Sequence, residues 1–235
     1  MRIDVLPDAD AVAEAAARLV AGEARAAVAA RGRFAFAVSG GNTPWRMLRV
    51  LAGEALPWKA IQIFQVDERV ALDGDPDRNL THLRESLLSR VDLPGPNLHA
   101  MPVERGDLAE AAAAYARELA GTAGGVLDLV HLGLGTDGHT ASLVPGDPVL
   151  EVKDADVGVT GVYAGRRRMT LTYPALGRAR QILWVVTGAD KARALLRLEA
   201  GDPTIPAGRV RADRAVLLAD AAAAARLPPQ GKEDP

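Results

Sequence analysis

The sequence VLDLVHL at residues 126–132 runs directly into GLGTDGHTAS at residues 133–142. The first segment predicts a buried strand, because short apolar runs that end at turn residues are typical of strands covered on both faces. The second segment is a turn dense in glycine, and it follows the carboxyl end of that strand. Open α/β sheets bind their ligands at this end of their strands. The two segments therefore predict an α/β fold with a functional site in the turn.

Strands and helices alternate on both sides of this unit. Residues 8–30 are rich in alanine with spaced apolar residues, which predicts a long amphipathic helix ending at Gly32. Further helices are expected at residues 43–52, 80–88, 108–119 and 189–198. Further strands are expected at residues 33–38, 61–66, 157–163, 169–173, 182–187 and 215–219. This order predicts a mostly parallel sheet flanked by helices.

The composition is that of a globular protein, with 235 residues of which 49% are hydrophobic and 25% charged. Clusters of proline and glycine have the length of loops, and none has the composition of an interdomain linker. We therefore expect a single domain over residues 1–227 and a disordered tail over residues 228–235.

Charge and cysteine content exclude several classes of function. The formal net charge of −2 gives no global field for nucleic acid or an anionic membrane, so an anion site must be built locally. No apolar run approaches the roughly 20 residues that span a bilayer. The chain has no cysteine and hence no disulfide framework, thiol nucleophile or cysteine-ligated zinc site. Its first residues, MRIDV, lack the apolar core of a signal peptide, so we expect a cytoplasmic protein.

A candidate phosphate loop follows the predicted strand 33–38. Two glycines allow a tight turn, Pro44 favours the first helical turn, and the free N–H groups and the positive end of the helix dipole suit a phosphate. Its candidate binding residues are Ser39, Gly40, Gly41, Asn42 and Thr43. The loop is neither a Walker loop nor a dinucleotide fingerprint, which favours a smaller phosphate ester. The alternative is a plain strand-to-helix turn capped by Thr43.

A second polar segment, Asp67-Glu68-Arg69, follows the predicted strand 61–66. Asp67 and Arg69 are candidate ligand-binding residues at this strand end. The alternative is a solvated salt-bridge cluster, since acidic and basic neighbours are common on surfaces. Residues 77–79 are explained equally well as a cap of the next helix.

The turn itself carries Asp137 and His139. A nearby carboxylate orients an imidazole and stabilises its protonated form, so the pair suits general-base catalysis. The alternative is a histidine satisfied by turn backbone. The other histidines show no metal-ligand spacing with His139, and His131 lies within the strand, so we expect no metal site and a structural His131.

Candidate cations come from the second half of the chain. Arg168 ends the run Arg166-Arg167-Arg168, and Lys191 lies in the first turn of a predicted helix. A basic run is usually a solvated face, but a lysine at a helix N-terminus opposes the helix dipole, and a bound anion would compensate for this.

Four segments occur in order: SGGNTP at 39–44, DER at 67–69, GLGTDGHTASLVPG at 133–146 and RMTLT at 168–172. Together they closely resemble the 6-phosphogluconolactonase family, from about residue 39 to residue 223. The resemblance implies a modified Rossmann-like fold shared with glucosamine-6-phosphate deaminase and ribose-5-phosphate isomerase. It also implies hydrolysis of 6-phospho-D-glucono-1,5-lactone to 6-phospho-D-gluconate in the oxidative pentose phosphate pathway, without a cofactor.

At the residue level, the resemblance assigns His139 as the catalytic base, and we expect Asp137 to orient it. Residues 39–43 match the family's phosphate loop, and Arg168 and Lys191 match its cations. The expected partner is the sugar phosphate alone, with no nucleic acid or membrane, in a monomer or weak homodimer. The chain departs from the family at three positions, with Asn42 for serine or threonine, Arg78 for serine and Val144 for phenylalanine.

Two related functions are the alternatives. An aminosugar-phosphate deaminase or isomerase has Asn-Glu-Pro-Gly where this chain has Leu143-Val144-Pro145-Gly146. Valine cannot relay the proton that the deaminase glutamate relays in ring opening, which favours the lactonase. A non-catalytic sugar-phosphate sensor is disfavoured because no DNA-binding segment is evident and a sensor needs no Asp137 and His139 pair.

Overall fold

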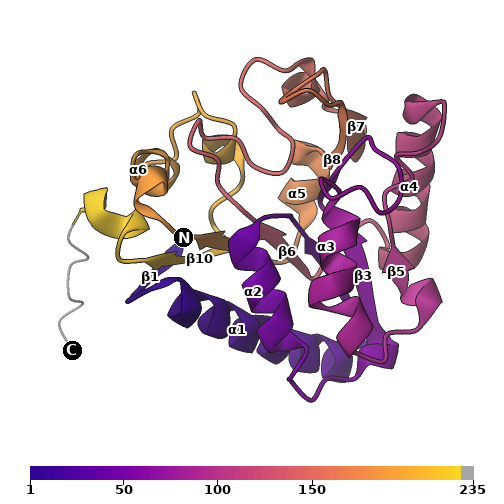
Figure 1. Cartoon of the computed structure of the whole chain (residues 1–235), viewed down its shortest axis with the longest axis horizontal. Helices are drawn as coiled ribbons and strands as arrows, with labels where there is room; N and C mark the ends of the chain where they lie inside the picture. Colours follow the sequence, from indigo (N-terminus) through magenta and orange to yellow (C-terminus); the bar gives the residue numbers. More distant parts are fainter. Residues whose placement is uncertain (229–235) are drawn as a thin grey trace.

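The computed structural model describes residues 1–228. Its main sheet has seven strands in the order β1-β10-β9-β6-β2-β3-β5, and every neighbouring pair is parallel (Figure 1). The strands are β1 (Arg2–Leu6), β2 (Phe34–Val38), β3 (Ile61–Gln65), β5 (Leu98–His99), β6 (Leu129–Leu132), β9 (Ile182–Val186) and β10 (Ala215–Asp220). The predicted parallel sheet is confirmed.

A smaller antiparallel sheet has the order β4-β8-β7. Its strands are β4 (Asp67–Arg69), β7 (Val157–Val159) and β8 (Arg168–Leu171). The register places Arg69 opposite Arg168 and Asp67 opposite Thr170. This sheet therefore joins two polar segments that lie far apart in the sequence.

The helices are α1 (Ala9–Arg31), α2 (Asn42–Leu51), α3 (Asn79–Ser86), α4 (Leu108–Ala123), α5 (Tyr173–Arg178) and α6 (Ala192–Glu199). Helix α1 begins where the Asp8 carboxylate accepts the N–H of Ala11, and ends at Gly32, whose φ of 73° suits glycine.

Two apolar cores lie on opposite faces of the main sheet. Leu183 and Val185 of β9 pack with residues of α1, α2 and α3, whereas Ile182, Trp184 and Val186 pack with residues of α4, α5 and α6. Successive side chains of a strand point to opposite faces, so a central strand buried on both sides must be apolar throughout. Burial on both faces of the sheet explains the continuous apolar runs in the sequence.

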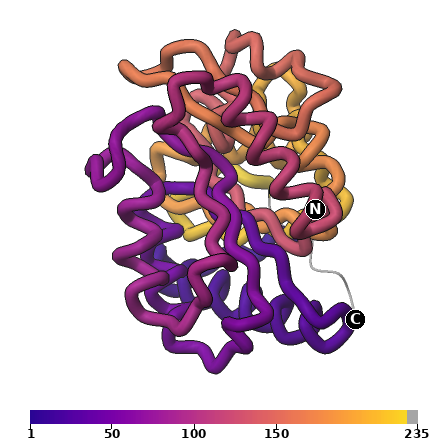
Figure 2. The backbone as a smooth tube through the Cα atoms, turned by 90° about the vertical axis from the view of Figure 1, so that its right-hand side faces the viewer, coloured from indigo at the N-terminus to yellow at the C-terminus, as the bar shows by residue number. Residues whose placement is uncertain are grey.

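Figure 2 shows the earlier part of the chain, in indigo and purple, mainly in the lower half of the view and the later part, in orange and yellow, mainly in the upper half. Between β2 and β6 the order of strands reverses, because β3 and β5 extend the sheet on one side and β9 and β10 on the other. A crevice at such a switch point is where sheets of this kind bind ligands.

Several predicted elements differ in extent. The strand expected at 157–163 ends at Val159, and the strand expected at 169–173 ends at Leu171. Tyr173 instead begins α5, whose first turn accepts Pro174 because no N–H partner is needed there. The helix expected at 189–198 starts as a 3₁₀ turn, η5 (Ala189–Lys191), before α6.

Strands β1, β4 and β5 were not expected from the sequence. The tail predicted at residues 228–235 lies, apart from Pro228, outside the described residues. Within residues 1–228, none of the helices combines the length and apolar character needed to cross a membrane.

Candidate active site

A pocket of about 470 Å³ lies at the carboxyl ends of β2, β6 and β9, at the switch point of the sheet. All predicted site residues except Asp137 line it: Ser39, Gly40, Gly41, Asn42, Thr43, Asp67, Arg69, His139, Arg168 and Lys191. Asp137 is in direct contact with the His139 imidazole. The structure thus brings together residues from five separate segments, as the strand-end argument predicted.

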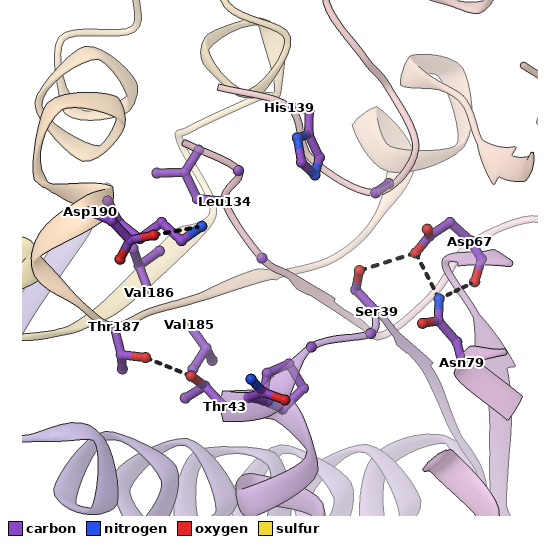
Figure 3. A pocket seen from close by; sticks show the side chains of 18 of the residues that line it. Ser39, Thr43, Asp67, Asn79, Leu134, His139, Val185, Val186, Thr187 and Asp190 are labelled. Carbon is purple, nitrogen blue, oxygen red and sulfur yellow. Dashed lines mark hydrogen bonds and ion pairs between the residues drawn. The ribbon is translucent and has the colours of Figure 1, made fainter. Parts of the chain in front are cut away.

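The candidate phosphate loop, residues 39–43, runs into the first turn of α2. Gly41 is the N-cap with φ 129°, and no side chain caps the helix. Thr43 does not cap it either; it lies inside the first turn, and its hydroxyl shares a hydrogen bond of 2.6 Å with that of Thr187 (Figure 3). The capping role that the alternative gave to Thr43 is therefore wrong. The uncapped N–H groups remain available to an anion.

Gly40 is required by close packing. A Cβ atom at this position would lie 1.9 Å from Oδ1 of Asn79, the oxygen that accepts a hydrogen bond from Arg69. Ser39 precedes it, and its N–H donates to Nδ1 of the buried His131 (3.3 Å). The predicted structural role of His131 therefore includes fixing the start of the loop.

The Asp67-Glu68-Arg69 segment is not a solvated cluster, because Asp67 is 3% and Glu68 0% exposed. Asp67 Oδ1 accepts from the Ser39 hydroxyl (3.2 Å), and its Oδ2 accepts from the Ser142 hydroxyl (2.7 Å). Figure 3 shows Asp67 between Ser39 and Asn79, whose amide donates to the Asp67 carbonyl (2.8 Å). Asp67 therefore joins three segments of the site.

Glu68 points away from the pocket and caps α3. Its carboxylate accepts from the N–H groups of Asn79 and Leu80 (both 2.8 Å), so the side chains of residues 77–79 are not the cap. Arg78, one of the departures from the family pattern, forms a buried ion pair with Glu68 (3.1 Å) and another pair with Glu104 (2.7 Å). Burial lowers the pKa of Arg78, but these carboxylates outweigh it and raise it overall.

The imidazole of His139 points into the pocket (Figure 3). Its Nδ1 lies 2.6 Å from Asp137 Oδ1, and this oxygen also accepts the His139 backbone N–H (3.1 Å). A carboxylate at this distance favours the tautomer with the proton on Nδ1, in which Nε2 can accept a proton. Burial raises the pKa of Asp137, but the hydrogen bonds from His139 and Tyr163 outweigh it and lower it overall.

Gly135 makes this pairing possible. A Cβ at Gly135 would lie 2.1 Å from His139 Nδ1 and 2.6 Å from Asp137 Oδ1. A side chain here would displace the imidazole, so the turn requires glycine at position 135 for steric reasons.

Arg168 differs from the other candidate cations because its side chain is buried. It is 8% exposed, and within residues 1–228 it forms no ion pair, while its Nε is buried without a hydrogen-bond partner. Burial lowers the pKa of Arg168, and the nearby Arg69 lowers it further. A buried charge without a partner is unfavourable unless a ligand neutralises it. An anion bound in the pocket would neutralise this charge.

The other cations differ in their surroundings. Lys191 lines the pocket from η5 and lies 3.4 Å from Asp190. Arg166 pairs with Asp75 and Asp77 (both 3.0 Å), and the exposed Arg167 donates to the Thr160 carbonyl. Only Arg168 of the basic run lines the main pocket, so the solvated-face alternative holds for Arg167.

Sequence reasoning missed several residues at the site, namely Asn79, Ser142, Tyr163, Thr187 and Asp190. Thr187 directly follows β9, and the rule that strand ends carry function could have found it. Tyr163 is the last residue of the strand expected at 157–163, but that strand ends at Val159 and Tyr163 instead starts the turn between β7 and β8. Within the described part of the chain, no cluster of three or more metal-ligating side chains is placed to hold a metal ion.

Comparison with known proteins agrees with this geometry. The family model described as Glucosamine-6-phosphate isomerases/6-phosphogluconolactonase matches residues 7–218. A protein named 6-phosphogluconolactonase from a Nostoc species is 37% identical over 235 aligned residues, covering 96% of this chain and 98% of that protein.

Solved structures give the same picture. The crystal structure of a 6-phosphogluconolactonase from Thermotoga maritima matches with a TM-score of 0.84 and 27% identity, over 93% of this chain and 98% of that one. A monomeric glucosamine-6-phosphate deaminase also matches with a TM-score of 0.84, over 96% of this chain and 100% of that one, but at 19% identity. That second likeness shows the fold alone, so the choice between the two activities depends on the residues of the site.

Proposed function

Because the chain belongs to the glucosamine-6-phosphate isomerase/6-phosphogluconolactonase family, we propose that it hydrolyses 6-phospho-D-glucono-1,5-lactone to 6-phospho-D-gluconate. One observation carries the proposal: the His139 and Asp137 pair faces the pocket that holds the unpaired Arg168 and the uncapped start of α2. A base and an anion site in one pocket suit a neutral ester that carries a phosphate.

The phosphate binds the N–H groups of residues 40–43, with Arg168 and Lys191 as its cations. Charge-assisted hydrogen bonds of this kind are stronger than neutral ones. The phosphate oxygens replace Asp190 as the partner of Lys191, which lies 3.4 Å from that carboxylate. The phosphate does not react, so its binding energy serves to place the lactone carbonyl beside His139.

Neutral His139 then acts as a general base. Its Nε2 takes a proton from water as the water oxygen bonds to C1, which gives a tetrahedral intermediate with a negative oxygen. The C1 bond to the ring oxygen then breaks, and the imidazolium returns the proton to that oxygen. The new carboxylic acid releases its proton to solvent. A single general base contributes about 10²- to 10⁴-fold, which suffices for an activated ester.

Asp137 holds the Nδ1 proton and stabilises the imidazolium that forms. Arg69 either orients the sugar hydroxyls or stabilises the oxyanion. Asp67 lines the pocket, yet both of its carboxylate oxygens already accept hydrogen bonds from Ser39 and Ser142. We therefore assign Asp67 to holding the loop and the turn in register beneath the substrate. The proposed chemistry needs no cofactor.

The second candidate is the aminosugar-phosphate deaminase, whose fold this chain shares. Ring opening needs a proton relay at the position of Val144, which is 5% exposed here and carries no titratable group. The lactonase needs no such relay, so this position favours the hydrolytic reaction.

The test supplies freshly prepared lactone and follows acid release above the spontaneous rate. Wild type is expected to exceed the background, and His139→Ala is expected to lose about 10²- to 10⁴-fold of that excess. A wild-type rate equal to the background contradicts the assignment. Ammonia release from glucosamine 6-phosphate would support the deaminase, and tight binding without turnover would support a sensor.

We propose further that residues 1–227 form a single domain. We also propose that the protein is cytoplasmic and is a monomer or a weak homodimer. Both apolar cores lie against the same main sheet, which supports a single domain. A charged sugar phosphate does not cross membranes unaided, which suits an enzyme in the compartment where the ester is made. Light scattering across a concentration series tests the oligomeric state; a tetramer would contradict it.

A further inference from the structure

Tyr163 lies outside the residues that the proposed reaction uses. It starts a tight turn between β7 and β8, where its N–H donates to the Arg166 carbonyl (2.9 Å) and its carbonyl accepts in return (3.3 Å). Ala164 and Gly165 have φ values of 49° and 81°, as in the favoured two-residue hairpin turns. Arg166 ties this hairpin to the loop after β4 through Asp75 and Asp77. The backbone under Tyr163 is therefore anchored.

The Tyr163 side chain contacts three functional groups at once. Its hydroxyl donates to Asp137 Oδ2 (3.2 Å), and its ring meets the His139 ring edge to face with centroids 5.6 Å apart. The Arg168 guanidinium carbon lies 5.0 Å from the centre of the tyrosine ring, within the range of a cation–π interaction. Tyr163 thus links the proposed base with the proposed phosphate-binding cation.

The hydroxyl completes the hydrogen bonding of Asp137. Oδ1 accepts from His139, and Oδ2 accepts from Tyr163, so both carboxylate oxygens are held. A carboxylate bound at one oxygen alone can rotate, whereas one bound at both keeps a fixed plane. That plane sets the direction of the His139 ring and hence of its Nε2.

We propose that Tyr163 is a positioning residue of the hydrolytic site, which holds Asp137 through its hydroxyl and Arg168 through its ring. The proposal rests on the proposed function for its kinetic consequence, but the contact with Asp137 is testable without turnover.

The charges around Tyr163 keep it a donor. Burial raises its pKa, and the adjacent Asp137 raises it further, while Arg168 lowers it, with a net rise. The phenol therefore stays protonated through neutral pH. The other charged groups of the pocket that His139 and Arg168 line are Asp67, Arg69, Asp190 and Lys191. The phenol hydroxyl donates to Asp137 and the ring faces Arg168, so these two, rather than the other four, are its charged partners.

The kinetic experiment compares Tyr163→Phe and Tyr163→Ala with wild type. Phenylalanine keeps the ring and removes only the hydroxyl, so kcat is expected to fall about 2- to 10-fold with KM unchanged. Alanine also removes the ring beside Arg168, so KM is expected to rise as well. Val162→Ala is the matched control, because Val162 is 73% exposed on the same hairpin and is expected to retain wild-type kinetics.

The second experiment reads the Asp137 carboxyl directly, by a carbon NMR titration assigned through loss of its signal in Asp137→Asn. The pKa of Asp137 is expected to be higher in Tyr163→Phe than in wild type or Val162→Ala, because a donor to the charged form is lost. If wild type hydrolyses no lactone, the proposed function fails while this titration still decides whether Tyr163 holds Asp137. Wild-type kcat and an unshifted Asp137 titration in Tyr163→Phe would overturn the proposal.

Discussion

Replacing Asp137 by asparagine separates two tasks of the carboxylate. The amide oxygen can still accept from Nδ1 and N–H of His139, as Oδ1 does now at 2.6 and 3.1 Å. The amide nitrogen then faces the Tyr163 hydroxyl, which can accept as well as donate. Asp137→Asn therefore preserves the orientation of the imidazole and removes only the negative charge that stabilises the imidazolium.

The size of the effect follows from distance and exposure. Two unit charges about 4 Å apart attract by about 1 kcal/mol in water and about 4 kcal/mol near a protein surface. The side chains of His139 and Asp137 are 25% and 37% exposed, so water screens the pair and the lower part of this range applies. About 1–2 kcal/mol corresponds to a loss of about 5- to 30-fold in kcat/KM.

The assay is acid release from fresh lactone by Asp137→Asn, Asp137→Ala and His139→Ala. Asp137→Ala also loses the orientation of the ring, so its rate is expected to lie between those of the other two. Asp154→Asn, an exposed carboxylate away from the pocket, is the matched control and is expected to retain the wild-type rate. The reasoning is refuted if Asp137→Asn matches wild type, or if it falls as low as His139→Ala.

Three more substitutions test other parts of the site. Gly40→Ala is expected to lower kcat/KM at least tenfold, because the new Cβ would lie 1.9 Å from Asn79 Oδ1; a wild-type rate would contradict the close packing of the loop against Asn79. Arg168→Met is expected to raise KM about 10- to 150-fold and to raise the melting temperature, since an unpaired buried charge is removed; a lower melting temperature with unchanged KM would contradict this. Burial lowers the pKa of His131 from 6.5 to about 3. Between these two pH values the unfolded state binds a proton at His131 and the folded state does not, so the free energy of unfolding falls as the pH drops from 6.5 toward 3. Urea unfolding at pH 7 and pH 5 should show about 2 kcal/mol less loss of stability in His131→Gln than in wild type; equal losses would contradict the burial argument.

The central strands were predictable because burial on both faces leaves their sequences continuously apolar, as in Phe34–Val38 and Ile182–Val186. Strand β4 was not, because aspartate, glutamate and arginine have low strand propensity. Its extended form depends on pairing with β8, whose residues come about a hundred positions later. Helix α5 was hidden for a related reason, since its first residue, Tyr173, continues a run typical of strands.

The site residues were predictable where they follow a strand or a glycine turn, and the structure places them around one pocket. Asn79 was expected to be part of a helix cap, but its side chain contacts Asp67 and Arg69 instead. Tyr163 depends on a turn in which the alanine at 164 adopts a left-handed conformation, which its sequence does not indicate. Residues placed by long-range pairing leave no local pattern to detect.

The small antiparallel sheet accounts for the polarity of β4. Successive side chains of a strand alternate in direction, so Asp67 and Arg69 line the pocket while Glu68 points back to cap α3. The same pairing sets Arg69 opposite Arg168, two like charges on neighbouring strands. In the free protein this arrangement is unfavourable, as the lowered pKa of Arg168, caused by burial and by Arg69, indicates. If the phosphate binds Arg168 as proposed, its negative charges would offset this repulsion, and part of the free energy of binding would come from relieving an electrostatic cost that the small sheet holds in place.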